Sequence, residues 1–184
     1  MYFHFGTKKI VEAAAVLLGL EARCRMSYLR LLKLLYIADR QSLLQTGRPI
    51  IGTRPVAMDH GPAHSEVLDL INGQHWGEPE WAEFIRKDRY EVELRKDPGV
   101  LSLSRQEIET MRVVYEQYRD TDDWEVVRVT HGFPEWKKHY REKTSTEIPF
   151  EDIIEAVGLA DDREAILRDA QRTRALDELF RIAE

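Results

Sequence analysis

The chain has 184 residues, a single cysteine and a formal net charge of −6, from 33 acidic and 27 basic side chains. A chain of this length buries roughly 70% of its unfolded surface, enough to fold without a disulfide or a structural metal. The lone Cys24 excludes an intramolecular disulfide and a four-cysteine zinc site. The acidic balance argues against general nucleic-acid binding, which depends on neutralising phosphates.

We expect neither a membrane segment nor a secretion signal. No apolar run reaches the roughly 18 residues that cross a bilayer. The opening residues MYFHFGTKK lack the charged start, the apolar core and the cleavage site of a signal peptide. A free thiol is also better suited to a reducing compartment. The sequence therefore predicts a cytoplasmic protein with no membrane partner.

Two helices are predicted in the first quarter of the chain. Apolar residues recur at spacings of three and four from Ile10 to Leu18, which indicates a first helix that ends near Gly19. A stronger pattern predicts a second helix between an N-cap at Ser27 and a stop at Gly47. Leucines surround most of this second helix, so we expect it to be the central helix of the fold.

Two charged residues lie inside this leucine-rich helix. Lys33 and Asp39 fall within LKLLYIADR, where a buried charge needs either a partner or a path to solvent. Structural pairing and extension of the side chain to solvent are both consistent with the sequence.

The helical pattern breaks after the second helix. Prolines and Gly52 interrupt residues 48–59, and the alternation there predicts a short strand or hairpin. Pro62 suits the first turn of a helix, with Gly61 allowing the chain to turn before it. On this interpretation His60 precedes the helix and His64 lies within it, so the two histidines do not share one helix face.

The remaining elements are mainly helical. Residues 75–84 are predicted as a loop with at most one helical turn, and 90–94 as a strand that pairs with 55–59. Ser104 and Glu107 form a capping-box pattern at the start of a helix to about residue 119. Short helices are expected at 124–131, from Pro134 onward and around 150–157. An amphipathic helix is expected over 161–184.

These elements predict a mainly α fold (α+β). We expect a helical domain with a small β-hairpin or short antiparallel sheet over residues 1–145. Residues 146–184 are predicted to form a C-terminal helical extension. The sequence leaves open whether the apolar side of that extension packs on its own domain or on a partner.

Catalytic patterns find little support in the sequence. No nucleophile elbow, phosphate-binding loop or dinucleotide fingerprint is present. Cys24 has arginine neighbours but no histidine or aspartate partner that spacing can assign. The pair His60 and His64 leaves a zinc-dependent enzyme as one alternative, although no third ligand stands at a recognisable spacing. We therefore predict no catalytic residue, no metal and no cofactor.

The basic residues support a second alternative, a nucleic-acid-binding transcriptional regulator. One cluster contains Arg23, Arg25 and Arg30, and another lies in KKHYREK at 137–143. A solvated helix face explains either cluster more simply in an acidic chain.

Four segments, in their order and spacing, carry a resemblance to a known family. They are LLKLLYIADRQSLLQTGRPIIG, PVAMDHGPAHSEVLDLI, SLSRQEIETMRVVYEQY and VVRVTHGFPEW. The set resembles the Panacea domain of SocA-like antitoxins, a family with prophage-associated members, over about residues 7–140. The extension beyond about residue 145 is not explained by this pattern.

The resemblance implies an antitoxin of a toxin–antitoxin system, mainly helical, that neutralises a cognate protein toxin by direct binding and has no catalytic activity. Some relatives act as adaptors that deliver the toxin to a Clp-type protease. The oligomeric state stays open. The matched residues, which we assign to the scaffold, are Lys33, Leu34, Leu35, Tyr36, Asp39, Gly61, Pro62, His131 and Trp136. The candidate partner-binding residues are Trp76, Trp81, Leu176, Leu179 and Phe180.

Overall fold

The computed structural model describes residue 3 and residues 5–182, with side chains described up to Leu176. The helices in this part of the chain are α1 (Gly6–Gly19), α2 (Tyr28–Thr46), α3 (Ser65–Ile71), α4 (Glu78–Phe84), α5 (Arg105–Tyr118), α6 (Asp123–His131), α7 (Pro134–His139), α8 (Phe150–Ala156), the 3-10 turn η1 (Ala160–Asp162) and α9 (Arg163–Ile182). The strands are β1 (Arg25–Ser27), β2 (Pro55–Met58), β3 (Gly61–His64), β4 (Ile85–Asp88), β5 (Glu91–Leu94) and β6 (Thr146–Glu147). The predicted mainly α fold with small antiparallel sheets is confirmed.

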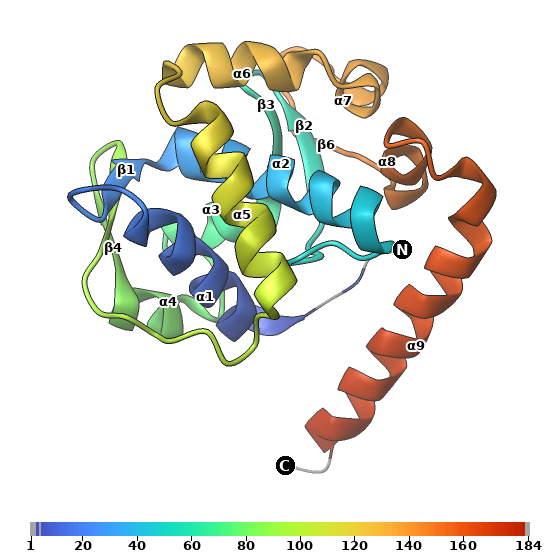
Figure 1. The fold of residues 1–184 in the computed structure, drawn as a ribbon, viewed down its shortest axis with the longest axis horizontal. Coiled ribbons are helices and arrows are strands. Elements are labelled where there is room, and N and C mark those ends of the chain that lie inside the picture. Colours follow the sequence, from blue (N-terminus) through green and yellow to red (C-terminus); the bar gives the residue numbers. More distant parts are fainter. Residues whose placement is uncertain (1–2, 4, 183–184) are drawn as a thin grey trace.

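Helix α2 is the central element, as its sequence predicts. Its residues from Arg30 to Asp39 are all buried. Helices α1, α5 and α6 and strand β3 pack around it (Figure 1). The Ser27 hydroxyl caps the first turn by accepting a hydrogen bond from the Arg30 amide. Gly47 ends the helix in the left-handed conformation, at φ 74°.

Two three-stranded antiparallel sheets flank this helical core. The first has the order β3-β2-β6 and the second the order β1-β5-β4. The prediction that residues 90–94 pair with 55–59 is wrong, because β5 pairs with β1 and β4. Strand β4 immediately precedes β5, and a hairpin between neighbours closes a shorter loop than a pairing with β2.

The segment DHGPAH forms the turn and the second strand of a β-hairpin. The prediction of a helix at Pro62 is wrong. Residues Gly61–His64 pair with β2, and helix α3 starts only at Ser65. Proline is tolerated here because β3 is an edge strand of its sheet. The Pro62 carbonyl accepts a hydrogen bond from Lys33, so the polar edge of the backbone at Pro62 faces away from β2. The N–H group that proline lacks would therefore not have bonded to β2, and the pairing of the two strands loses no hydrogen bond.

Two local predictions have opposite outcomes. The capping box at the start of α5 is confirmed. The Ser104 hydroxyl accepts a hydrogen bond from the Glu107 backbone amide, and the Glu107 carboxylate accepts one from the Ser104 backbone amide. The predicted loop at 75–84 instead contains α4, which spans seven residues and has Pro79 in its first turn. Burial of Trp81 stabilises this helix through tertiary packing, which a short local pattern does not reveal.

The first part of the C-terminal segment, β6 and α8, packs into the body of the protein. Strand β6 pairs with β2, and the α8 residues Phe150, Ile153 and Ile154 are buried in a second core cluster with Leu43 and Trp136. Helix α9 then runs alongside the body and away from it (Figure 1). Whether residues 146–184 are a separate unit stays a prediction.

We expect Gly61→Ala to destabilise the protein by about 2 to 5 kcal/mol. Gly61 has φ 89°, and an added Cβ would lie 2.5 Å from the Thr130 hydroxyl oxygen. The left-handed backbone costs an alanine about 1 to 2 kcal/mol, and overpacking adds about 1 to 3. Urea unfolding measures the loss.

Gly73→Ala is the matched control, because Gly73 also has a positive φ, 70°, but has open space around its Cβ position. It should lose only the backbone contribution of about 1 to 2 kcal/mol. Equal losses in the two variants would contradict the close packing of Gly61 against α6.

Candidate functional site

A group of buried polar side chains connects α2 to the segments that pack on it. Asp39 lies at its centre, and its carboxylate accepts hydrogen bonds from three successive backbone amides. The donors are Ile50 and Ile51, each at 3.0 Å, and Gly52, at 3.2 Å. The carboxylate therefore holds the loop between α2 and β2. Burial raises the pKa of Asp39 above its ordinary value, although the amide bonds act in the opposite direction.

His64 lies beside this carboxylate at the end of β3. Its Nε2 is 3.4 Å from Asp39 Oδ2, a contact that does not have hydrogen-bond geometry. Its ring also contacts Tyr36, with centroids 5.5 Å apart. Burial lowers the pKa of His64, while the negative charge of Asp39 acts against that shift. Burial thus favours the neutral imidazole, whereas the three backbone donors favour the ionised form of Asp39.

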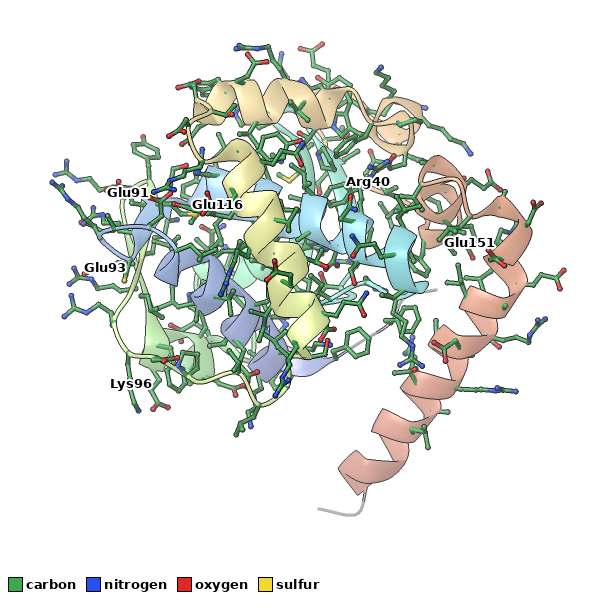
Figure 2. The ribbon with its side chains drawn as sticks, viewed as in Figure 1. Arg40, Glu91, Glu93, Lys96, Glu116 and Glu151 are labelled. Atoms are coloured by element: carbon green, nitrogen blue, oxygen red, sulfur yellow. The ribbon has the colours of Figure 1, made fainter. Side chains whose placement is uncertain are left out.

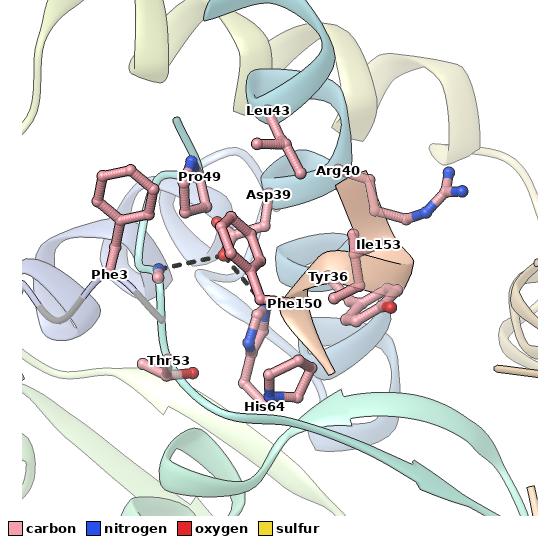
Figure 3. A pocket seen from close by; sticks show the side chains of 12 residues that line it. Phe3, Tyr36, Asp39, Arg40, Leu43, Pro49, Thr53, His64, Phe150 and Ile153 are labelled. Carbon is pink, nitrogen blue, oxygen red and sulfur yellow. Dashed lines mark hydrogen bonds and ion pairs between the residues drawn. The ribbon is translucent and has the colours of Figure 1, made fainter. Parts of the chain in front are cut away.

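The cavity at this position is too small for a substrate. Asp39, His64 and Thr53 line it together with apolar side chains such as Phe150 (Figure 3). Its volume of about 20 Å³ has room for about one water molecule. Ligand pockets usually measure roughly 300 to 1,000 Å³. These residues thus stabilise packing around α2 and do not form a substrate cleft.

A second polar group connects α2 to α7. The Glu135 carboxylate is buried and accepts hydrogen bonds from the Tyr36 hydroxyl, at 3.0 Å, and from Arg40 Nε, at 2.6 Å. The Arg40 guanidinium also lies over the Phe133 ring, 3.9 Å from its centroid. Burial and the nearby Glu135 carboxylate hold the pKa of Tyr36 well above its ordinary value. This group therefore fixes α7 against the middle of α2.

Lys33 connects α2 to the hairpin. Its buried ammonium donates a hydrogen bond to the Pro62 carbonyl at 2.6 Å. No ion pair among the described residues includes Lys33, and burial lowers its pKa to about 7. Lys33 and Asp39 thus do not pair with each other, and each bonds to backbone groups that come later in the chain.

His131 and Trp136 complete the connection at the other end of the hairpin. Their rings stack with centroids 4.2 Å apart, and Trp136 Nε1 donates a hydrogen bond to the Met58 carbonyl at 3.0 Å. Burial and the nearby Lys33 lower the pKa of His131, and a hydrogen bond with the Asp59 backbone acts against this shift. The α6–α7 segment is thereby attached to the tip of the hairpin.

The structure thus brings most of the matched residues into contact around one hairpin. Leu34 and Leu35 lie in the main core, and Gly61 provides the close approach to α6. The other matched residues make the hydrogen bonds and ring contacts described above. Their shared position supports the proposal that they are scaffold residues.

The two histidines of the possible zinc site are not brought together. The exposed His60 lies against Trp124, with ring centroids 5.2 Å apart, whereas His64 is buried against Tyr36. Within the described part of the chain, no group of three or more His, Cys, Asp or Glu side chains is placed to hold a metal ion. Cys24 is partly exposed in a turn at φ 49°.

The basic clusters are largely occupied by contacts within the protein. Arg25 pairs with Asp88 and Glu91, and Lys138 pairs with Asp152. Arg30 is buried and donates to backbone carbonyls at the end of α5. Acidic and basic side chains are mixed over the surface, as with Glu91 and Glu93 on β5 and Lys96 just after this strand (Figure 2). These contacts weaken the nucleic-acid alternative.

The candidate partner-binding residues differ in exposure. Trp81 is 2% exposed and packs in the main core, so its assignment to a partner surface is wrong for this fold. Trp76 is 72% exposed and Leu176 is 53% exposed. Leu179 and Phe180 lie in the last turns of α9, and their side chains are outside the described residues. Trp76 and the end of α9 remain proposals.

Three residues of this site were missed in the sequence. Glu135 sits in the first turn of a helix, where an acidic side chain usually complements the helix dipole. Arg40 looks like a solvent-facing arginine, and Thr130 like an ordinary helix residue. No local signal distinguishes them, because their partners come from elements far away in the sequence.

Comparison with protein families identifies the class. The family model described as "Antitoxin SocA-like, Panacea domain" matches residues 31–137, from α2 to α7. This range covers more than half of the chain and includes every matched residue named above. The chain therefore belongs to the SocA-like antitoxin family with a Panacea domain, which confirms the resemblance. Neither the curated proteins nor the solved structures gave a match.

The described residues contain no helix with the length and apolar character required to cross a membrane.

We expect Asp39→Asn to lower the free energy of unfolding by about 2 to 4 kcal/mol. The amide keeps one acceptor oxygen, but its NH2 group faces a backbone N–H where Asp39 has a second acceptor. Urea unfolding monitored by circular dichroism measures the change. The control Asp97→Asn alters an exposed carboxylate that accepts one backbone N–H, from Gly99, and should cost less than about 0.5 kcal/mol. Equal costs would refute a central role for Asp39.

Replacing Lys33 should change how stability depends on pH. The unfolded chain holds this proton up to about its ordinary pKa of 10.5, whereas the folded chain releases it near 7. Between these values the unfolded state binds more protons, so this group makes stability rise with pH, by at most about 1.4 kcal/mol per pH unit. Relative to Lys33→Met, the native protein should gain about 2 kcal/mol between pH 7 and 9.

Urea unfolding at several pH values measures this difference. Lys137→Met changes an exposed lysine on α7 and should follow the pH dependence of the native protein. A constant offset between Lys33→Met and the native protein across this range would show that Lys33 titrates normally.

Proposed function

We propose that this protein is the antitoxin of a toxin–antitoxin pair and neutralises a cognate protein toxin by direct binding. The observation that carries the proposal is the family match over residues 31–137. The matched polar residues are engaged within the protein, and the cavity beside Asp39 is too small for a substrate. Both features favour a binding protein without catalytic activity.

We place the toxin contact on the C-terminal half of α9. The first turns of this helix are attached to the body, where Ile166 and Ala170 are buried and Asp169 accepts two hydrogen bonds from Arg48. Beyond these turns the helix extends past the body (Figure 1), and Leu176 is exposed. The sequence continues the apolar pattern with Leu179 and Phe180. An amphipathic helix with an uncovered apolar side is a common form of protein recognition.

Trp76 is a second candidate contact, since large exposed aromatic side chains often dominate binding energy at protein interfaces. The same proposal includes a second mode of action, delivery of the toxin to a Clp-type protease. Its distinguishing result would be loss of toxin protein in cells that contain both the antitoxin and the protease. A cytoplasmic location is consistent with each version.

Coexpression with the adjacent open reading frame tests the function. We expect the native protein to restore growth that the neighbouring gene product inhibits, and the two proteins to copurify. Growth inhibition that persists at equal expression, without copurification, would refute the antitoxin proposal.

Leu176→Asp tests the contact surface. A charge on the apolar side of α9 should weaken toxin binding by about 10- to 100-fold, equivalent to about 1.4 to 2.8 kcal/mol, without loss of folding. Isothermal titration measures the affinity. Val113→Asp is the matched control, because Val113 lies on α5 and is also 53% exposed. Equal effects of the two substitutions would exclude α9 as the specific contact.

A further inference from the structure

A second pocket opens between the first turns of α2 and the β2–β3 hairpin. Its volume is about 450 Å³, within the usual range of small-molecule sites. Its walls are largely apolar, with Leu29 and Leu32 from α2, Met58 from β2 and Leu68 from α3. Unlike the cavity beside Asp39, this pocket has room for an organic molecule.

Lys33 is the buried basic group of this apolar pocket. The side chain is part of the pocket lining, and its ammonium makes one hydrogen bond, to the Pro62 carbonyl. An ammonium group has three N–H donors, so two remain available. A buried cation without an acidic partner is costly, and an anion that reached it would recover that cost. The low pKa of Lys33 reflects the same cost.

The groups around Lys33 do not supply it with a counter-ion. His60 lines the pocket, and His131, which is close enough to sense the charge of Lys33, has a buried Nε2 without a hydrogen-bond partner. Asp59 is the acidic residue of the lining, and its carboxylate accepts a hydrogen bond from the Lys143 amide at 2.9 Å and another from the Tyr140 hydroxyl. Asp59 therefore does not serve as the counter-ion of Lys33.

We propose that this pocket binds a small organic monocarboxylate, with its carboxylate on Lys33 and its apolar body against Leu29, Leu32 and Leu68. A carboxylate supplies the acceptors that the ammonium lacks, and charge-assisted hydrogen bonds of this kind are short and strong. The apolar walls select a hydrocarbon or aromatic body over a sugar or a phosphate ester. The inference is separate from toxin neutralisation, since it requires only the folded protein.

Titration with phenylacetate and phenylacetamide tests the charge requirement. The two probes have the same aromatic body, and only the acid carries a charge. Isothermal titration of the full chain should show at least tenfold tighter binding of phenylacetate. Equal affinities for the two probes would overturn the proposal. The absence of phenylacetate binding at about 10 mM, a concentration near the weak limit of measurable affinity, would overturn it as well.

Three variants locate the binding. Lys33→Met should weaken phenylacetate binding at least tenfold and leave the weak binding of phenylacetamide unchanged. Leu29→Trp keeps Lys33 but fills the pocket, so it should abolish binding of both probes, and it decides the question if Lys33→Met does not fold. Lys137→Met removes an exposed lysine outside the pocket and should bind as the native protein does. Equal weakening by Lys33→Met and Lys137→Met would show that phenylacetate responds only to net charge.

Discussion

A helix that is buried around its whole circumference can carry charged residues only if the surrounding chain supplies partners for them. Helix α2 carries Lys33 and Asp39 in its buried stretch, and both find backbone partners in the segment that follows. Asp39 takes the amides of the loop before β2, and Lys33 takes a carbonyl of β3. Because an unsatisfied buried charge costs several kcal/mol, these bonds determine where the hairpin lies on α2. The α6–α7 segment then attaches to the hairpin through Trp136 and to α2 through Glu135.

This arrangement separates the residues that define the family from the surface that is open to a partner. The matched residues are mostly directed into the protein, where they hold α2, the hairpin and α7 together. The projecting half of α9 lies outside the range of the family match. Trp76 lies within that range, but it is exposed and lies away from this polar group. On the proposed function, an interior held together by the matched residues and a separate contact surface would allow one scaffold to serve different toxins.

Local signals in the sequence predicted much of the fold. The caps of α2 at Ser27 and Gly47 and the capping box of α5 depend on residues within one or two turns, and all are as expected. The hairpin at Pro62 and helix α4 were predicted incorrectly. Proline suits both a helix start and an edge strand, and only the pairing with β2 distinguishes them. Trp81 likewise has no local mark that separates a core tryptophan from an exposed one.

By itself, the sequence determined the helical content, the central role of α2, the family and the presence of two charges that require partners. Only the tertiary structure decided which partners they have and which surfaces remain open. Lys33 bonds to a residue 29 positions later, and Tyr36 to one 99 positions later. Periodicity and capping act over one or two helical turns, whereas these contacts form only when distant segments meet on α2, so their identity is a property of the folded chain.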